Sequence, residues 1–152
     1  MSTLYARKIL LKEELEAIGS VAVESAALEG FVEWTICRVC GLPEHIGRLL
    51  LGNMTLGGKI SSMVDLVKEC VGQDEYQEIF QQLVSGISHE ISNRNMVIHG
   101  LRTGPAREFN AADVQQVAQR LHFLHGQLTD LVLTRVLTRL GEVQSRQDDI
   151  TP

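Results

Sequence analysis

Arg94, Asn95 and His99 bring a cation, an amide and an imidazole closer together than any other stretch of the chain. An imidazole with an ordinary pKa of about 6.5 can accept and return a proton near neutral pH. A guanidinium is always charged, and its planar fork matches pairs of anionic oxygen atoms. Together the three residue types could supply proton transfer and anion binding from one short segment.

The spacing of these residues limits how they could act together. They stand near the end of an expected helix over 74–100, which Gly100 would close. On a regular helix Asn95 and His99 share one face, whereas Arg94 and His99 point about 140° apart. Arg94 and His99 could serve one site only if the arginine stem bends round, if the last turn unwinds, or if two chains pool their residues.

The surroundings of Arg94 also allow an ordinary structural role. Glu90 stands one turn before Arg94, the favourable order for an ion pair on a helix. The alternative to a functional site is therefore an Arg–Glu pair and a surface histidine at a frayed helix end. Arg94 also falls within the apolar stripe of the expected helix, where a guanidinium is costly unless it snorkels, finds a partner or is covered by another chain. The expected apolar stripe comprises Ile79, Phe80, Leu83, Ile87, Ile91, Ile98 and Leu101, opposite a polar stripe of Ser88, Ser92, Asn95 and His99.

Composition bounds the class of protein. The chain has 152 residues, of which 44% are hydrophobic and 22% charged, as in ordinary globular domains. We predict one domain over 1–144 and a polar tail over 145–152. The net charge of −5 argues against a surface coated in cations for nucleic acid. A local basic segment exists nevertheless, because 94–107 holds three arginines and a histidine but no acid.

The cysteine count and the N-terminal residues indicate in which cellular compartment the protein works. Three cysteines, an odd number, fit a reducing environment better than a disulfide framework. The first residues, 1–19, lack the apolar core of a signal peptide. No run approaches the roughly 18 uninterrupted apolar residues of a membrane span. We therefore expect a cytoplasmic protein with no membrane segment.

Apolar spacing and helix-ending residues predict an all-α bundle of about five antiparallel helices. We expect a helix over 3–18, a break at Gly19-Ser20, and a helix over 21–40 that buries Ala27, Phe31, Trp34 and Val39. Short turns over 44–58 lead into a helix over 56–71, which Thr55 caps and Gly72 ends. An Asp74–Gln77 capping pair opens a helix over 74–100, a connection follows over 101–109, and Asn110 caps the last helix. The last helix repeats apolar residues with coiled-coil-like spacing at Val114, Val117, Leu121, Leu124, Leu128, Leu131, Leu137 and Leu140.

Cys37 and Cys40 form a CxxC that His45 or Cys70 could in principle complete as a zinc site. A redox CxxC usually opens a helix after a strand, whereas this one closes an apolar helix. We therefore interpret the pair as two small core residues whose role the sequence leaves open.

Three further patterns suggest sites without completing them. His122 and His125 lie one turn apart like metal ligands, but no carboxylate stands at helical spacing beside them, which favours surface or seam histidines. His89 begins an HExxH pattern that Asn93 interrupts. The glycine-rich segment 52–58 lacks a GKS or GKT, so a tight helical crossing is favoured over a phosphate loop. No metal site is predicted.

The segment Arg94-Asn95-x-x-x-His99 resembles the R-x(4–6)-H signature of the HEPN superfamily, including the polar residue that its nuclease members carry directly after the arginine. The setting is similar too, since the motif ends a penultimate long helix and a long final helix follows. The resemblance spans the chain from the first helix to about Leu140, and its specific part is the motif itself. The short connection over 101–109 departs from a family that often inserts a hairpin or loop there.

The resemblance implies a metal-independent endoribonuclease without a cofactor, active as a homodimer whose two motifs face one cleft. Single-stranded RNA would supply the nucleophile, its own 2′-hydroxyl, and the products would be a 2′,3′-cyclic phosphate and a 5′-hydroxyl. His99 would move protons, Arg94 would stabilise the phosphorane-like transition state, and Asn95 would orient the imidazole or hold a phosphate oxygen. Arg102 and Arg107 would guide the strand, unless they are simply solvated loop arginines.

A second hypothesis belongs to another class of protein: a non-catalytic HEPN-like module that dimerises or binds a partner. Its partner could be an antitoxin or regulatory protein in a toxin–antitoxin, defence or stress system. The acidic net charge fits such a protein-binding role as well. A nucleotide-binding, nucleotidyltransferase-partnered member of the family is a third possibility.

Overall fold

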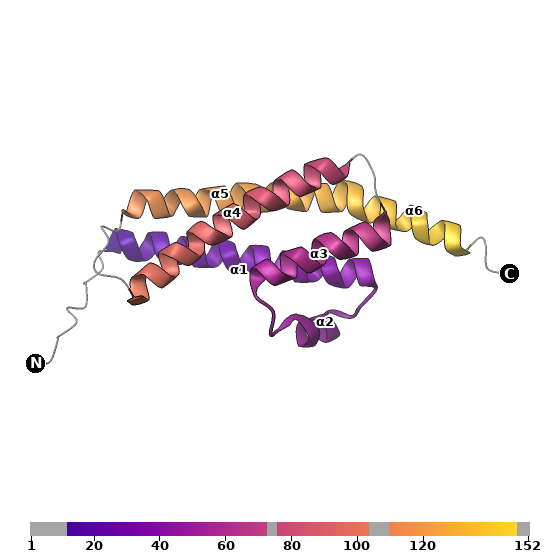
Figure 1. Ribbon diagram of the computed structural model, residues 1–152, viewed down its shortest axis with the longest axis horizontal. Helices are drawn as coiled ribbons and strands as arrows, with labels where there is room; N and C mark the ends of the chain where they lie inside the picture. Colours follow the sequence, from indigo (N-terminus) through magenta and orange to yellow (C-terminus); the bar gives the residue numbers. More distant parts are fainter. Residues whose placement is uncertain (1–11, 73–75, 104–109, 149–152) are drawn as a thin grey trace, which may run out of the picture.

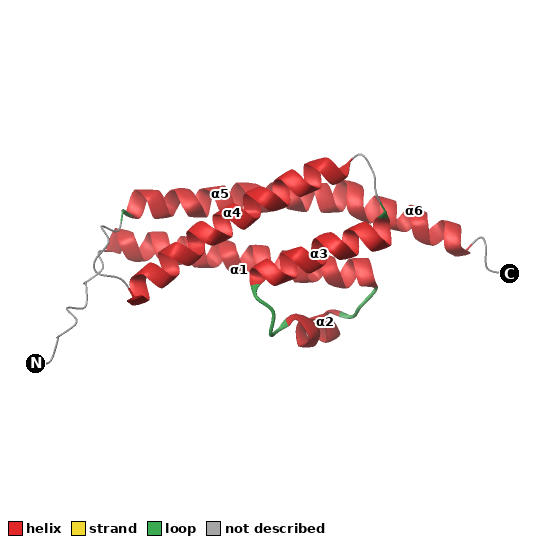
Figure 2. Ribbon diagram, in the orientation of Figure 1, coloured by secondary structure: helices red, strands yellow, loops and turns green. Residues whose placement is uncertain are grey.

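The computed structural model describes residues 12–72, 76–103 and 110–148. These residues form helices joined by short turns, with no strand among them, so the all-α prediction is confirmed (Figure 2). The elements are α1 (Lys12–Cys40), α2 (Glu44–Leu51), α3 (Leu56–Val71), α4 (Tyr76–Thr103), α5 (Ala111–Leu131), the π-helical turn η1 (Val132–Val136) and α6 (Leu137–Asp148). Because α5, η1 and α6 follow one another directly, the described part of the chain contains five helical rods.

The directions of the helices differ in part from the antiparallel arrangement expected (Figure 1). Helix α4 runs antiparallel to α5, because Glu90 of α4 meets Arg120 and the earlier Gly86 faces the later Leu124. By contrast, α1 and α5 run in the same direction: Glu24 pairs with His122 and, further along both helices, Phe31 contacts His125. Helix α3 also runs along α1, and α2 lies outside them (Figure 1).

Helix α1 is longer than the sequence pattern predicted. The expected break at Gly19-Ser20 is wrong, since the helix continues without interruption from Lys12 to Cys40. The Ser20 hydroxyl donates to the carbonyl of Glu16 instead of capping a new helix. Ala17 and Val21 are both buried on either side of the glycine, so tertiary packing outweighs the cost of about 1 kcal/mol for a glycine inside a helix.

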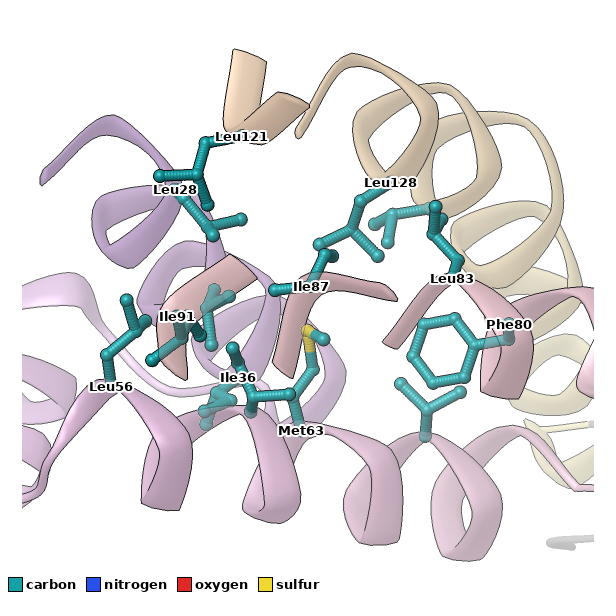
Figure 3. Close-up of a cluster of buried hydrophobic side chains, with 14 of the residues drawn as sticks. Leu28, Ile36, Leu56, Met63, Phe80, Leu83, Ile87, Ile91, Leu121 and Leu128 are labelled. Atoms are coloured by element: carbon teal, nitrogen blue, oxygen red, sulfur yellow. The ribbon is translucent and has the colours of Figure 1, made fainter. Parts of the chain in front are cut away.

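The core lies between α1, α3, α4 and α5, whose apolar side chains point into one interior (Figure 3). Burying a large apolar side chain completely contributes about 1.5–3 kcal/mol. The expected inner face of α1 is largely wrong: Val39 is buried, but Ala27 is exposed and Phe31 and Trp34 are only half-buried. The fully buried members of the cluster include Val21, Leu28, Val32, Ile60, Met63, Val67, Phe80, Ile87, Leu121 and Leu128.

Helix α4 carries the candidate motif and extends past its expected end. Gly100 does not close it, because the helix runs on to Thr103 and includes the start of the expected connection. Of the predicted apolar stripe, the four residues Phe80, Leu83, Ile87 and Ile91 are buried. Ile79 is 58% exposed, and the side chains of Ile98 and Leu101 lie outside the described residues.

Helix α2 packs against α1 through a glycine. A Cβ placed on Gly47 would lie only 2.1 Å from the Sγ atom of Cys37. The sequence did not predict a close helix approach at Gly47. A Cβ placed on Gly57, in the segment expected to form a tight crossing, would meet no neighbouring atom within 4 Å. The apolar residues Leu49 and Leu50 of α2 point to the surface.

The helix caps follow the sequence closely. Thr55 Oγ1 accepts a hydrogen bond from the backbone N–H of Gly58, and Asn110 Oδ1 accepts one from Ala112, as predicted for N-cap residues. Gly72 ends α3 with a positive φ of 86°, which glycine adopts without strain. The Gln77 amide donates to the Gly72 carbonyl, while its expected capping partner Asp74 lies outside the described residues.

The last helix is interrupted by the π-helical turn. Of its predicted apolar repeat, four residues are buried in α5 and Leu140 is buried in α6, while Leu124, Leu131 and Leu137 are half-buried; the four are Val114, Val117, Leu121 and Leu128. The hydroxyls of Thr129 and Thr134 donate to carbonyls one turn earlier, a bond that locally bends helices. None of the described helices combines the length and apolar character needed to cross a bilayer.

Candidate functional site

The three motif residues lie on one continuous helix, because α4 is regular from Tyr76 to Thr103. Of the three ways to bring Arg94 and His99 to one site, the unwinding of the last turn is therefore excluded. The two backbone positions stand about 7.5 Å apart along the axis and about 140° apart around it. Either the arginine stem bends round or a second chain contributes.

The guanidinium of Arg94 is turned toward Asn95. Its Nη1 donates to the Asn95 Oδ1 atom at 2.9 Å. Asn95 lies between the directions of Arg94 and His99 on a helical wheel, so this contact draws the cation toward the face that His99 occupies. Within one chain this contact brings the side chains of Arg94 and Asn95 together. The His99 side chain itself lies outside the described residues.

Glu90 does not pair with Arg94, so the ion pair considered as the alternative to a functional site does not form. Its Oε1 atom lies 2.8 Å from Nε of Arg120 on α5, and its Oε2 accepts a hydrogen bond from the Asn93 side-chain amide at 3.2 Å. Only 5% of Glu90 is exposed, whereas the Arg120 side chain is half-exposed. Both oxygens of the carboxylate are therefore bound by residues other than the motif arginine.

Arg94 is consequently a half-buried cation with no carboxylate partner among the described residues. Its Nε atom is buried and makes no hydrogen bond. A buried donor without an acceptor costs about 1–3 kcal/mol, and more when it is charged. Because no carboxylate neutralises the guanidinium, Arg94 is suited to binding an anion that reaches it.

The other predicted basic residues can be placed only in part. Arg102 belongs to the last turn of α4 and not to a connecting loop, although its side chain lies outside the described residues. Arg107 lies outside them altogether. Ser88 and Ser92 of the predicted polar stripe are exposed, and Asn95 is half-buried.

A buried ionic cluster between α1 and α3 was not predicted from the sequence. Lys59 is 3% exposed, and its ammonium donates to Glu29 and, at 2.6 Å, to Glu33. Burial by itself would lower the pKa of Lys59, but the hydrogen bonds to the two carboxylates and their charges outweigh it and raise the pKa. Two glutamates one turn apart repel each other on a helix, and that spacing was the available signal that a cation fits between them.

The sequence predicted surface or seam histidines: His125 is half-buried in the seam between α1 and α5, whereas the His122 side chain is exposed. Glu24 of α1 places a carboxylate oxygen 3.2 Å from Nδ1 of His122. The ring of His125 packs 5.5 Å from that of Phe31, centroid to centroid. Burial in this seam lowers the pKa of His125, against the opposing effect of Glu24.

The cysteines are free thiols. Cys37 is buried, whereas Cys40 and Cys70 are half-buried. Burial raises the pKa of Cys37, and the nearby Glu44 and Glu33 raise it further, so the thiol is a poor nucleophile. Among the described residues no group of three or more His, Cys, Asp or Glu side chains could hold a metal ion.

An open groove of about 570 Å³ lies elsewhere, between α4 and the junction of α5 with η1. It is lined by four apolar and five polar side chains. Arg94 and Asn95 do not line it. The lining residues are Ile79, Gln82, Leu83, Leu124, Gln127, Asp130, Leu131, Thr134 and Arg135.

No family model, curated protein or solved structure matches this chain.

Proposed function

We propose that the chain is a metal-independent endoribonuclease of HEPN type, which cleaves single-stranded RNA with Arg94, Asn95 and His99. The observation that supports this proposal most is the state of Arg94. Its guanidinium has no carboxylate partner in the described part of the chain and donates instead to the neutral side chain of Asn95. A phosphodiester oxygen is an acceptor of the right charge and geometry.

The proposed reaction needs no group beyond these side chains and the RNA. Neutral His99 removes the proton of the 2′-hydroxyl, whose oxygen attacks the adjacent phosphorus. The bond from phosphorus to the 5′-oxygen breaks, and that oxygen takes a proton from an imidazolium. The products are a 2′,3′-cyclic phosphate and a 5′-hydroxyl. Arg94 stabilises the negative charge that develops on the phosphoryl oxygens, and Asn95 keeps the guanidinium turned toward the reacting group.

The reaction uses one base and one acid at the same time, and a single chain carries one motif histidine. A homodimer with two motifs at one cleft would supply both imidazoles. The bent stem of Arg94 removes one reason for a dimer, since it already turns the cation toward the His99 face. The second imidazole remains the reason for proposing one.

The decisive experiment incubates single-stranded RNAs of varied sequence with the wild type, Arg94→Ala and His99→Ala in the presence of EDTA. We expect cleavage by the wild type, a loss of about 10²–10⁴-fold in His99→Ala, the usual contribution of a general acid–base group, and a loss of about 10²–10³-fold in Arg94→Ala, the usual contribution of a group that stabilises transition-state charge. Arg146→Ala, a change of the same charge near the end of α6, serves as the control and should cleave normally. End-group analysis should find the cyclic phosphate.

The absence of cleavage by folded wild type, or full activity in Arg94→Ala, would contradict the nuclease proposal. If the wild type is dimeric and folded yet cleaves none of the RNAs, the non-catalytic partner-binding module becomes the better account. Sedimentation of the wild type tests the homodimer separately, and saturable nucleotide binding that Arg94→Ala abolishes would indicate the nucleotide-binding alternative.

A further inference from the structure

Two arginines, Arg94 and Arg120, could form an ion pair with Glu90. Arg94 stands one turn later on the same helix, in the order that favours an ion pair. Arg120 reaches across from α5, and its Nε lies 2.8 Å from the Oε1 of Glu90. The second carboxylate oxygen accepts from the Asn93 amide. Each oxygen of Glu90 therefore has a partner other than Arg94, and the Arg94 guanidinium points to Asn95.

Because the Glu90 carboxylate is buried, the loss of its partner Arg120 would have a large effect. Glu90 is only 5% exposed, so its charge has little contact with solvent. Breaking a buried pair by removing one partner leaves an uncompensated charge, which is strongly destabilising. Without Arg120, the carboxylate would retain only the neutral Asn93 amide. The nearest remaining cation at helical spacing is Arg94, whose Nε lacks an acceptor.

We propose that Arg120 is a positioning residue: by holding Glu90 it keeps the Arg94 guanidinium available to an external phosphate group. The exchange of Glu90 from Arg120 to Arg94 involves only residues of this chain. Only the role assigned to the phosphate rests on the proposed function. Arg120 acts through Glu90 and does not itself touch the substrate. Removing Arg120 should let Glu90 neutralise Arg94.

The exchange can be observed without RNA. In ¹⁵N-labelled protein the Nε–Hε resonance of Arg94, identified by its absence in Arg94→Lys, reports on the acceptor at Nε. In Arg120→Ala we expect this resonance to shift and its proton to exchange more slowly with solvent. In the double variant Glu90→Gln/Arg120→Ala it should return to the wild-type position, because the carboxylate is gone.

The matched control is Arg48→Ala. Arg48 also pairs with a glutamate one turn away, at 3.9 Å from Glu44, but on the exposed helix α2. This variant removes the same charge and should leave the Arg94 resonance unchanged. If Arg120→Ala does not fold by circular dichroism, Arg120→Gln replaces it, since a glutamine amide can still donate to Glu90 and should give a smaller shift. An unchanged Arg94 resonance in a folded Arg120 variant overturns the proposal.

The consequence for RNA is tested with a 2′-O-methylated single strand, which lacks the attacking hydroxyl. We expect Arg120→Ala to bind it about 10- to 100-fold more weakly, the change expected for loss of a charge-assisted hydrogen bond. The Glu90→Gln/Arg120→Ala variant should recover the affinity, which lost packing alone would not do. If the wild type does not bind the strand, the proposed function fails, while the resonance still decides whether Arg120 keeps Arg94 from Glu90.

Discussion

Lys59 Nζ lies 2.6 Å from Oε1 of Glu33, and the same ammonium also reaches Glu29, so that one buried lysine joins α3 to two acids of α1. The partners differ in access to water. The lysine side chain is 4% exposed, against 36% for Glu29 and 22% for Glu33. The cluster therefore has an asymmetric response to mutation, because only the carboxylates can turn to solvent.

Removing the acids should cost more than removing the base. In Glu29→Gln/Glu33→Gln the ammonium remains buried beside neutral amides, and we expect the free energy of unfolding to fall by about 3 kcal/mol. In Lys59→Met the carboxylates can rehydrate and the apolar chain stays packed, so the loss should stay within about 1 kcal/mol. Urea unfolding measures both. Equal losses, or a greater loss in Lys59→Met, would show that the carboxylates are not solvated as the exposures indicate.

The same cluster predicts an effect of alkaline pH. The hydrogen bonds and charges of Glu29 and Glu33 overcome the effect of burial and raise the pKa of Lys59 above its unfolded value of about 10.4. The folded state thus holds its proton to higher pH than the unfolded state does. The stabilising contribution is complete below about pH 10.4 and is lost as the pH rises through the folded pKa. The difference in unfolding free energy between wild type and Lys59→Met should accordingly stay constant up to about pH 10 and shrink above it.

Because Gly47 lies against Cys37, we expect the effect of Gly47→Ala on the free energy of unfolding to change sign when Cys37 is replaced by alanine. In Gly47→Ala the new Cβ would meet Sγ of Cys37 at 2.1 Å, and we expect a loss of about 1–3 kcal/mol in unfolding free energy. In a Cys37→Ala background the sulfur is absent and the nearest atom, the Cβ of residue 37, lies 3.7 Å away. Alanine should then stabilise by up to about 1 kcal/mol through its helix propensity.

Gly86→Ala is the matched control for Gly47→Ala. A Cβ on Gly86 would meet a methyl group of Leu124 at 3.4 Å, close to an ordinary contact. This variant should therefore be neutral or stabilising in the wild-type background. Thermal unfolding of the four variants decides the matter, and a stable Gly47→Ala single variant would mean that the Cys37 side chain moves aside freely.

His125 predicts a loss of stability at mildly acidic pH. Burial between α1 and α5 lowers its pKa below the ordinary 6.5. As the pH falls below about 6.5, the unfolded state takes up the proton first, so the free energy of unfolding falls until the folded pKa is reached. His125→Gln removes this dependence. The slope of stability between about pH 7 and pH 5 should be smaller in His125→Gln than in wild type, and unchanged in the exposed His45→Gln.

The helices and their caps could be predicted where local chemistry decides them. Thr55 and Asn110 have hydroxyl or amide oxygens suited to N-caps, and both bond as expected. The break at Gly19 failed because the apolar residues on either side of it pack into the core and hold the helix together. The end at Gly100 was also wrong, since a glycine weakens a helix without preventing its continuation.

The candidate site could be predicted by residue type but not by partner. The Glu90–Arg94 spacing satisfies the rule for helical ion pairs, yet Arg120 of another helix takes the carboxylate. Such a partner depends on how α4 and α5 pack, which helical spacing does not contain. The orientation of the Arg94 guanidinium toward Asn95 likewise follows from the loss of its expected partner.

Asn95 offers the most direct test of what Arg94 binds. Its Oδ1 accepts from Nη1 of Arg94 at 2.9 Å, so Asn95→Asp would convert this hydrogen bond into an ion pair with almost no change of shape. The new carboxylate should compete with phosphate for the guanidinium and weaken binding of a 2′-O-methylated single strand by about tenfold. Loss of one phosphate contact should also reduce the slope of log affinity against log salt concentration by about 0.7. Fluorescence anisotropy across a salt series measures the slope, and an unaltered slope in Asn95→Asp would show that Arg94 does not contact the RNA backbone.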